Sequence, residues 1–290
     1  MDWFYLALLS ALSLAFADAF SKKYFAENTG FELLLVRFFV PGLLLLPITL
    51  AGTYPGISSA FWLWIAILVP MELVAMLLYS LAIRDSPLYL TLPYLAFTPV
   101  INVFTANLIL DESVTGQNLF GVVLVVCGAY LLNLRKPGNG GLPDLIQPLK
   151  AIVTERGSRL MLTAAVIYSL TGAMGKGAMQ YVEPRTFGAF YFSIIGISAL
   201  IVVLLTKPQD VKVVIRKPRY SLLVGICMAI MVITHFLSIS QIEVAYMVAV
   251  KRTSMLFGII LGAILFSEKH LSQHFFAGSL MVAGVVVILI

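Results

Sequence analysis

The second half of the chain repeats residues of the first half at one constant spacing. Five residues of the first half, Glu112, Gln117, Phe120, Leu124 and Gly128, recur in the second half as Glu268, Gln273, Phe276, Leu280 and Gly284. Each pair is separated by the same number of positions, 268 − 112 = 156. A glutamate and a glutamine that recur at one offset in so apolar a chain indicate a fused duplication. The fold is therefore expected to contain two copies of one structural unit.

The composition places both copies in lipid. The 290 residues are 60% hydrophobic and only 11% charged, with a mean hydropathy of +0.99. A helix needs roughly 20 apolar residues to cross the hydrocarbon core, and ten stretches of this kind can be read: 3–23, 31–51, 59–83, 87–109, 115–134, 159–180, 185–206, 218–240, 242–266 and 272–290. Runs such as 119–132 are apolar on every face, which excludes the alternating pattern of barrel strands. The sequence predicts an all-α polytopic membrane protein with ten transmembrane helices.

The duplication divides these ten helices into two sets of five. The predicted domains are a first repeat over 1–134, a basic loop over 135–158 and a second repeat over 159–290. Because five is an odd number, the second repeat must enter the membrane from the opposite side. Two inverted five-helix repeats are an architecture of secondary transporters.

Charge predicts the orientation of the helices in the membrane. The two long loops between predicted spans are 135–158 and 207–217, and both fall on one side of the predicted bundle. With their flanks they hold Arg135, Lys136, Lys150, Arg156, Arg159, Lys207, Lys212, Arg216, Lys217 and Arg219. The positive-inside rule makes this side cytoplasmic and puts both termini outside. The first apolar stretch has no basic residue before it, so we interpret it as a span and not as a signal peptide. A plasma (inner) membrane is the expected location.

Several functional classes lack support in the sequence. The formal net charge of +5 records orientation, and nothing predicts nucleic-acid binding. Cys127 and Cys227 lie inside predicted spans and are interpreted as small packing residues. Glu268, His270 and His274 include a histidine pair four apart, but they fall at a water-exposed turn without a fourth ligand, so no metal is expected. Motifs for a phosphate loop or a nucleophilic triad are missing, and we expect neither an enzyme nor a cofactor.

Two adjacent cations in the ninth span are the most unusual feature of the apolar segments. The run Lys251-Arg252-Thr253-Ser254 lies near the middle of that span, where a charge costs about 2.5–3.5 kcal/mol on insertion scales. One interpretation is that these residues line a polar cavity and bind an anionic group. The other is a structural role, either in a buried ion pair with Glu72 in the third span or in contact with carbonyl oxygens at a helix break. Neighbouring helical residues point about 100° apart, so one cavity wall does not receive both cations equally.

Carboxylates in other spans are candidates for coupling. Glu72 lies near the middle of the third span, where it either exchanges a proton during transport or balances the central cations in a structural salt bridge. Asp18 lies toward the cytoplasmic end of the first span and is a second candidate for charge balance.

The fourth and ninth spans differ in their expected regularity. Pro87, Pro93 and Pro99 remove backbone donors from the fourth span and favour a broken helix, although simple kinks that face lipid explain them equally well. The corresponding part of the ninth span has no proline. Its small residues, Ser254, Gly258 and Gly262, permit close helix contact instead.

Polar aromatic side chains complete the candidate site. Tyr79 and His235 are related by the repeat offset and lie near one end of the third and eighth spans. Tyr94 adds a hydroxyl to the fourth span. Each alone is more often an interhelical hydrogen bond than a ligand, and together they are expected to shape a cavity.

The pattern as a whole resembles the EamA family of the drug/metabolite transporter superfamily. The resemblance rests on Ser86-Pro87-Leu88, Phe97-Thr98-Pro99-Val100 and Leu110-Asp111-Glu112, with Gln117 and Gly128, and on the repeated Phe266-Ser267-Glu268, Gln273 and Gly284. Lys22 and Arg37 also resemble basic residues of the first two helices of that family. The resemblance implies ten helices in two inverted repeats around a central cavity, and transport of small metabolites.

These features together predict a secondary transporter that moves a small anionic or zwitterionic, amino-acid-like metabolite by alternating access. The candidate substrate-binding residues are Arg252, Lys251, Ser254, Tyr79, Tyr94 and His235, and the candidates for coupling or charge balance are Glu72 and Asp18. The expected partners are the solute, a coupling ion or proton, and membrane lipid. A lipid-carrier flippase and a non-transporting membrane subunit are the two alternatives.

Overall fold

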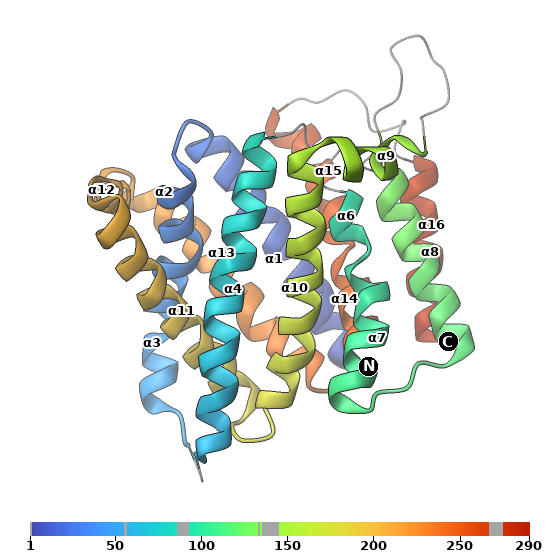
Figure 1. The fold of residues 1–290 in the computed structure, drawn as a ribbon, viewed down its shortest axis with the longest axis horizontal. Helices are drawn as coiled ribbons and strands as arrows, with labels where there is room; N and C mark the ends of the chain where they lie inside the picture. Colours follow the sequence, from blue (N-terminus) through green and yellow to red (C-terminus); the bar gives the residue numbers. More distant parts are fainter. Residues whose placement is uncertain (1, 55–56, 86–92, 133, 135–144, 267–274) are drawn as a thin grey trace. The chain divides into compact units, whose positions relative to one another are not determined.

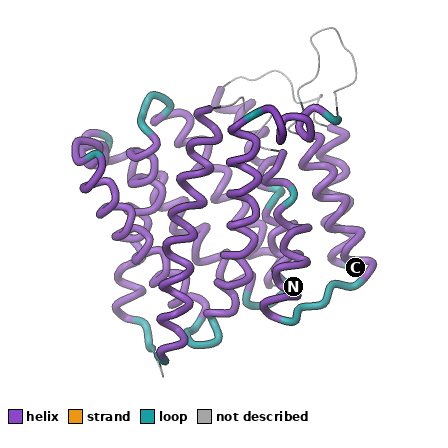
Figure 2. The backbone as a smooth tube through the Cα atoms, in the orientation of Figure 1, coloured by secondary structure: helices purple, strands orange, loops and turns teal. Residues whose placement is uncertain are grey.

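The computed structural model describes residues 2–54, 57–85, 93–132, 134, 145–266 and 275–290. Figure 2 shows that these residues form helices joined by loops, and none of the described residues lies in a strand. Pro87, Glu268, His270, Gln273 and His274 fall outside the described ranges, so the expectations that rest on them are not addressed by the structure.

The described helices follow the predicted spans closely. The helices within the first five predicted spans are α1 (Asp2–Phe25), the run α2, η1 and α3 (Gly30–Leu34, Leu35–Phe39 and Val40–Ala51), α4 (Ser59–Asp85), α6 and α7 (Pro93–Ala96 and Thr98–Leu110) and α8 (Gly116–Leu132) (Figure 1). Those within the last five are α10 (Arg156–Ala178), α11 (Pro184–Thr206), α13 (Pro218–Ile239), α14 and α15 (Val244–Lys251 and Ser254–Phe266) and α16 (Phe275–Leu289).

Length and composition show that this is a polytopic membrane protein. Among the described residues, six helices or helix runs are long and apolar enough to cross a membrane: Asp2–Phe25, Gly30–Ala51, Ser59–Tyr79, Pro184–Thr206, Pro218–Ile239 and Val244–Gly262. Three more apolar helices are shorter, Thr98–Leu110, Gly116–Leu132 and Phe276–Leu289.

The two long loops contain helices that the sequence did not predict. The inter-repeat segment holds α9 (Gln147–Thr154), and the segment after α11 holds η2 (Pro208–Val211) and α12 (Lys212–Arg216). All three are short, which explains why no long apolar or periodic pattern predicted them.

The chain forms two compact units, which are described separately. Unit 1 comprises residues 1–73, 174–242 and 253–269, and unit 2 comprises 74–173, 243–252 and 270–290. Each unit therefore takes residues from both halves of the sequence.

In unit 1, α1 runs antiparallel to α13. Ser238 at the end of α13 donates to the carbonyl oxygen of Trp3 at 2.7 Å, and Lys217, just before α13, donates to the carbonyl oxygen of Tyr24 at 2.7 Å. The C-terminal half of α1 also packs tightly against α15, since Ala15 and Ala19 are buried against Leu261. Small side chains on α1 permit this close approach, as is common between helices in lipid.

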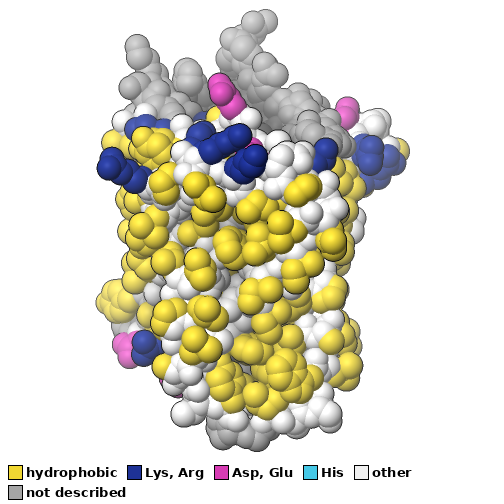
Figure 3. Space-filling view, turned by 90° about the vertical axis from the view of Figure 1, so that its left-hand side faces the viewer, with side chains coloured by type: hydrophobic (Ala, Val, Ile, Leu, Met, Phe, Trp, Pro, Cys, Tyr) yellow, Lys and Arg dark blue, Asp and Glu magenta, His cyan; other side chains and the backbone are white. Residues whose placement is uncertain are grey.

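Charge is distributed unevenly along unit 1. The antiparallel pairing places the end of α1 beside the segment that joins α11 to α13, and that end of the unit carries Lys22, Lys23, Lys207, Lys212, Arg216, Lys217 and Arg219. Figure 3 shows Lys and Arg side chains gathered at one end of the face in view, above a belt of hydrophobic side chains. Trp3 lies at the other end of unit 1, because it contacts the last turn of α13.

A pair of glycines brings α3 and α11 together in unit 1. A Cβ atom at Gly42 would lie 2.6 Å from the carbonyl oxygen of Phe192, and one at Gly196 would lie 2.7 Å from that of Phe38. The rings of Phe38 and Phe192 stack with centroids 5.7 Å apart. The two glycines are 196 − 42 = 154 positions apart, and the two phenylalanines are also 192 − 38 = 154 positions apart. Each glycine therefore meets the backbone of the opposing helix in the same way, and the contact is reciprocal.

Unit 2 contains a second reciprocal contact, between α8 and α16. A Cβ atom at Gly128 would lie 2.6 Å from the carbonyl oxygen of Ala277, and one at Gly284 would lie 2.5 Å from that of Gly121. Gly128 and Gly284 are repeat equivalents, and so are Gly121 and Ala277, since 277 − 121 = 156. The glycines that recur in the sequence are therefore contact points where the backbones of two helices approach each other too closely for a side chain.

Candidate functional site: a polar cluster around Arg252

The predicted break in the fourth span lies at Phe97. Helix α6 ends at Ala96 and α7 begins at Thr98, and the amide of Phe97 bonds to the carbonyl oxygen of Tyr94 at 3.2 Å. Pro99 has no N–H and cannot donate to the carbonyl oxygen of Leu95. The hydroxyl of Thr98 donates to that oxygen instead, at 2.8 Å. The proline thus interrupts the helical ladder, and the preceding threonine satisfies the acceptor left behind.

The ninth span is broken at the repeat-equivalent position, and a helix break there was one of the alternatives that the sequence left open. Helix α14 ends at Lys251 and α15 begins at Ser254. Thr253 corresponds to Phe97, since 253 − 97 = 156. The amide of Arg252 lies 3.1 Å from the carbonyl oxygens of both Val248 and Ala249, as expected where a helix tightens at its end. The only sequence signal was the pair Thr253-Ser254, whose hydroxyls compete with the backbone for hydrogen bonds.

Arg252 binds to the break in the fourth span. Its Nε donates to the hydroxyl oxygen of Thr98 at 3.0 Å, and its Nη2 donates to the same oxygen. Thr98 is 1% exposed and has already given its proton to Leu95, so its lone pairs are available to the guanidinium. The residues that break the fourth span therefore create the acceptor for the cation of the ninth span, all within unit 2.

Further hydroxyls extend this cluster along α7 and α10. The hydroxyl of Ser169 donates to the carbonyl oxygen of Ala165 at 2.9 Å and lies 3.3 Å from that of Thr98, and the hydroxyl of Thr105 donates to the carbonyl oxygen of Ser169 at 3.2 Å. Tyr79 and Tyr168 lie close enough to Arg252 to interact with it electrostatically. Thr98, Tyr168 and Ser169 had not been assigned to the site from sequence, although Thr98 belongs to the motif that carries the family resemblance.

The charge of Arg252 is not balanced by a carboxylate of the same unit. No acidic residue in the described part of unit 2 forms an ion pair with it. The guanidinium offers five N–H groups in a planar fork that fits a carboxylate or phosphate. An arginine that is half-buried among hydroxyls has the chemistry of an anion-binding site.

The other predicted residues of unit 2 surround this cluster. Lys251 is half-buried at the end of α14, next to Arg252. Tyr94 is 1% exposed and packs with Ala82 and Met161, and Tyr79 lies against the same hydrophobic cluster. Tyr79 thus packs against this cluster and also interacts electrostatically with Arg252, whereas the ring of Tyr94 packs in a core. The role of Tyr94 in a cavity stays a prediction.

The remaining predicted residues, Glu72, Asp18, His235 and Ser254, belong to unit 1. Asp18 forms an ion pair with Arg37, with 2.5 Å between Oδ1 and Nη1. Arg37 lies on η1, a π-helical turn of the kind often found at functional sites. His235 is half-buried with its ring edge-on to Phe236, and Ser254 opens α15. Their relation to the Arg252 cluster stays a prediction.

Glu112, the most distinctive residue of the repeat, holds the start of α14. Its Oε2 accepts from the amide of Val244, the first residue of α14, at 2.8 Å. Asp111 ends α7 in the left-handed conformation, with φ 54°, and this turn directs the next residue toward α14. Glu112 therefore caps the helix that carries Arg252. Sequence reasoning found this residue as a signature but not its function.

The comparisons with known proteins agree with this architecture. A family model, the EamA-like transporter family, matches residues 1–134 and again residues 156–290. The chain therefore belongs to the EamA-like transporter family, and it is a multi-pass membrane transporter of the drug/metabolite transporter superfamily. One solved crystal structure, described only as that of a protein, is similar with a TM-score of 0.71. The two are 15% identical over 98% of this chain and 94% of the other, which shows a shared fold. No curated protein sequence matches the chain significantly.

Proposed function

We propose that the protein is a secondary transporter that moves a small anionic or zwitterionic metabolite across the plasma membrane by alternating access. The family supports transport. The reciprocal glycine contacts of α3 with α11 and of α8 with α16 support two repeats, 1–134 and 159–290, in inverted orientation. Five helices in each repeat give the ten-helix architecture of this proposal.

The observation that carries the substrate class is the environment of Arg252. A cation at membrane depth is expensive unless a partner compensates it. The hydroxyl of Thr98 accepts two hydrogen bonds from Arg252 but is neutral, and no carboxylate of the described part of unit 2 supplies a negative charge to Arg252. A carboxylate or phosphate group of the solute would supply it, with Tyr79 and Tyr168 at its side. Broken helices are also where transporters place their substrate sites.

Coupling is assigned to a carboxylate outside this cluster. Asp18 is engaged by Arg37, which fits charge balance. Glu72, which lies near the middle of the third span, is our candidate for exchanging a proton, and uphill transport is coupled to an ion gradient or to exchange of solutes. Lys251, Ser254, Tyr94 and His235 complete the proposed cavity.

A thermal-shift screen of the detergent-purified protein tests the proposal, because a ligand that binds the folded state raises its apparent stability. We expect anionic or zwitterionic metabolites to stabilise the native protein and to lose this effect in Arg252→Gln, while the neighbouring Lys251→Gln keeps most of it. Uptake into proteoliposomes should follow the same order.

Three results contradict the proposal. Stabilisation by cations alone would place the binding chemistry elsewhere. Stabilisation by polyprenyl phosphates but by no soluble metabolite would identify a lipid-carrier flippase. An Arg252→Gln protein that binds and transports like the parent would make Arg252 a structural residue.

A further inference from the structure

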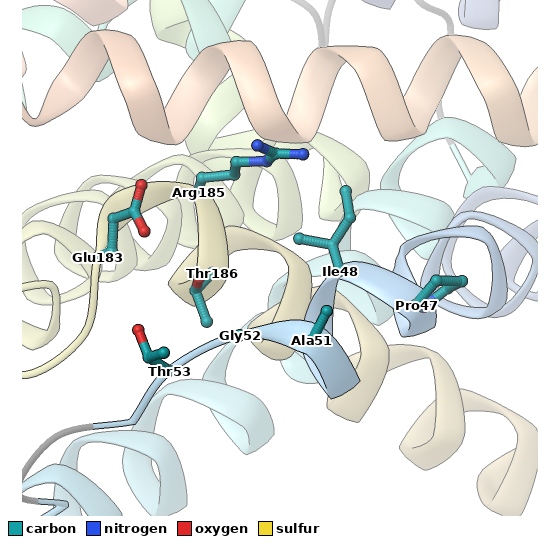
Figure 4. Close-up of a pocket in the computed structure, with 8 residues that line it drawn as sticks. All are labelled: Pro47, Ile48, Ala51, Gly52, Thr53, Glu183, Arg185 and Thr186. Carbon is teal, nitrogen blue, oxygen red and sulfur yellow. The ribbon is translucent and has the colours of Figure 1, made fainter.

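A pocket of about 450 Å³ opens between the end of α3 and the start of α11 in unit 1. Its volume lies within the range of roughly 300–1,000 Å³ that is typical of small-molecule sites. Figure 4 shows the two kinds of lining side chain. Glu183 and Arg185 come from the start of α11, and apolar Pro47, Ile48 and Ala51 come from the end of α3.

The polar groups of this pocket are not satisfied by the protein. Glu183 and Arg185 are exposed, and no described residue forms a hydrogen bond or an ion pair with either side chain. Thr186 lines the same pocket and is only 4% exposed, yet no described residue bonds to its hydroxyl. Among the described residues the buried hydroxyls without a partner are those of Ser21 and Ser221, so the hydroxyl of Thr186 is open to water or to a ligand in the pocket. One ligand in the pocket could therefore contact the carboxylate of Glu183, the guanidinium of Arg185 and the hydroxyl of Thr186.

The pocket lies at the level of a membrane surface. An aromatic cluster follows its lining residues along the chain: Tyr54, next to Thr53, contacts Phe190 with ring centroids 5.7 Å apart, and Phe190 contacts Trp62 at 6.0 Å. Tyrosine and tryptophan mark the depth of lipid headgroups. Leu50 of α3, one turn from the pocket, is 77% exposed, and Trp62 is 50% exposed. These side chains require contact with acyl chains, so the pocket opens at the lipid-facing perimeter of unit 1.

We propose that this pocket binds the headgroup of a zwitterionic phospholipid of the phosphoethanolamine type, in the leaflet opposite to the basic loops. Arg185 pairs with the phosphate and Glu183 accepts from the ammonium group. The hydroxyl of Thr186 donates to a phosphate or ester oxygen, and an acyl chain leaves along Pro47 and Ile48. Opposite charges two residues apart match a headgroup that carries one charge of each sign. The inference does not rest on the proposed transport function, because it involves none of the residues around Arg252.

Native mass spectrometry of the full-length protein in detergent measures the binding directly. The probes are dioleoyl lipids with ethanolamine, choline or glycerol headgroups, and free phosphoethanolamine. We expect the ethanolamine lipid to bind most tightly. Arg185→Gln should weaken its binding roughly tenfold, as the loss of a charge-assisted hydrogen bond predicts. Glu183→Gln should remove the preference for ethanolamine over choline, because choline has no N–H to donate.

Controls separate this site from other effects. Arg216→Gln makes the same charge change at the opposite end of unit 1 and should leave lipid binding unchanged. Arg252→Gln should also leave it unchanged, so that failure of the transport proposal is distinguishable from failure of this one. Equal affinity for all three lipids, a preference for the glycerol headgroup, or an unchanged Arg185→Gln variant would overturn the assignment. Equally tight binding of free phosphoethanolamine would overturn a lipid source and make the pocket a site for soluble zwitterions.

Discussion

Two helix contacts within unit 2 differ in how far they keep the duplication. Where α8 meets α16, the repeat equivalents Gly128 and Gly284 make the same contact with the opposing backbone. Where α7 meets α14, Arg252 binds Thr98, but the repeat equivalent of Arg252 is Ala96, since 252 − 156 = 96. Ala96 is fully buried and carries no charge. The packing contact is symmetric and the polar contact is not, which agrees with our proposal that the duplicated residues serve the scaffold and the diverged residues bind the solute.

The largest expected effect concerns the symmetric contact. Gly284→Ala would place a Cβ 2.5 Å from the carbonyl oxygen of Gly121, and Gly128→Ala would place one 2.6 Å from that of Ala277. Backbone cannot move aside as a flexible side chain can, so each change should destabilise the protein by about 1–3 kcal/mol. Because the two contacts are equivalent, the two variants should lose similar stability in thermal unfolding.

Gly258→Ala is the matched control for these variants. Gly258 lies inside the apolar helix α15, and no described atom of its unit comes within 4 Å of the position of its Cβ. The expectation of close helix packing at Gly258 is therefore wrong for the described part of unit 1. Alanine should be tolerated here or stabilise the helix by up to about 1 kcal/mol. A large loss at only one of Gly128 and Gly284 would break the symmetry argument.

The next effect concerns the asymmetric contact. Arg252→Ala copies the residue found at the equivalent place in the first repeat, and it should weaken solute binding by roughly tenfold or more, as for the loss of a charged hydrogen-bond donor. Arg252→Lys keeps the charge but loses the planar fork, so it should recover only part of the affinity. Isothermal titration with the best ligand of the screen measures both. A lysine variant as weak as the alanine variant would show that geometry, and not charge, dominates.

These contrasts show which features the sequence could predict. The spans were predicted because hydropathy over about 20 residues is a strong signal. A break in the fourth span was one of two alternatives, because its prolines remove backbone donors, whereas the break after Arg252 has no comparable marker. Helices α9 and α12 were not predicted, since eight and five residues are too few to establish a helical pattern in the sequence.

The candidate site was only partly predictable for a similar reason. Arg252 stood out because a charge in an apolar span is rare. Thr98 and Ser169 did not stand out, because small hydroxyl residues are common in membrane helices and only the fold shows which of them meet. Glu112 was visible as a repeated residue, but its bond to Val244 joins positions 132 residues apart, which a single sequence does not reveal.

A smaller effect is expected where the scaffold holds the helix of Arg252. Glu112→Ala removes the acceptor of the Val244 amide and should cost about 1 kcal/mol, as for other helix caps. Glu112→Gln keeps a carbonyl oxygen at the same place and should cost less. Asp111→Gly should be tolerated, because Asp111 has a φ of 54°, which glycine adopts without strain. Chemical unfolding orders the three variants. Equal losses for Glu112→Ala and Glu112→Gln would mean that charge, and not capping, is the function of Glu112.

The smallest effect concerns Asp18 and Arg37 of unit 1. Their side chains are 54% and 20% exposed, so the ion pair is expected to contribute only about 0.2–1 kcal/mol to stability in a double-mutant cycle of Asp18→Asn and Arg37→Gln. A scaffold pair of this kind should change stability and leave the solute affinity of the Arg252 cluster unaltered. If Asp18→Asn instead abolishes uphill transport while counterflow persists, Asp18 carries the coupling proton and Glu72 is left with charge balance. Stability and counterflow measured on the same variants therefore distinguish a residue that only stabilises the fold from one that takes part in coupling, which the ion-pair distance of 2.5 Å alone does not do.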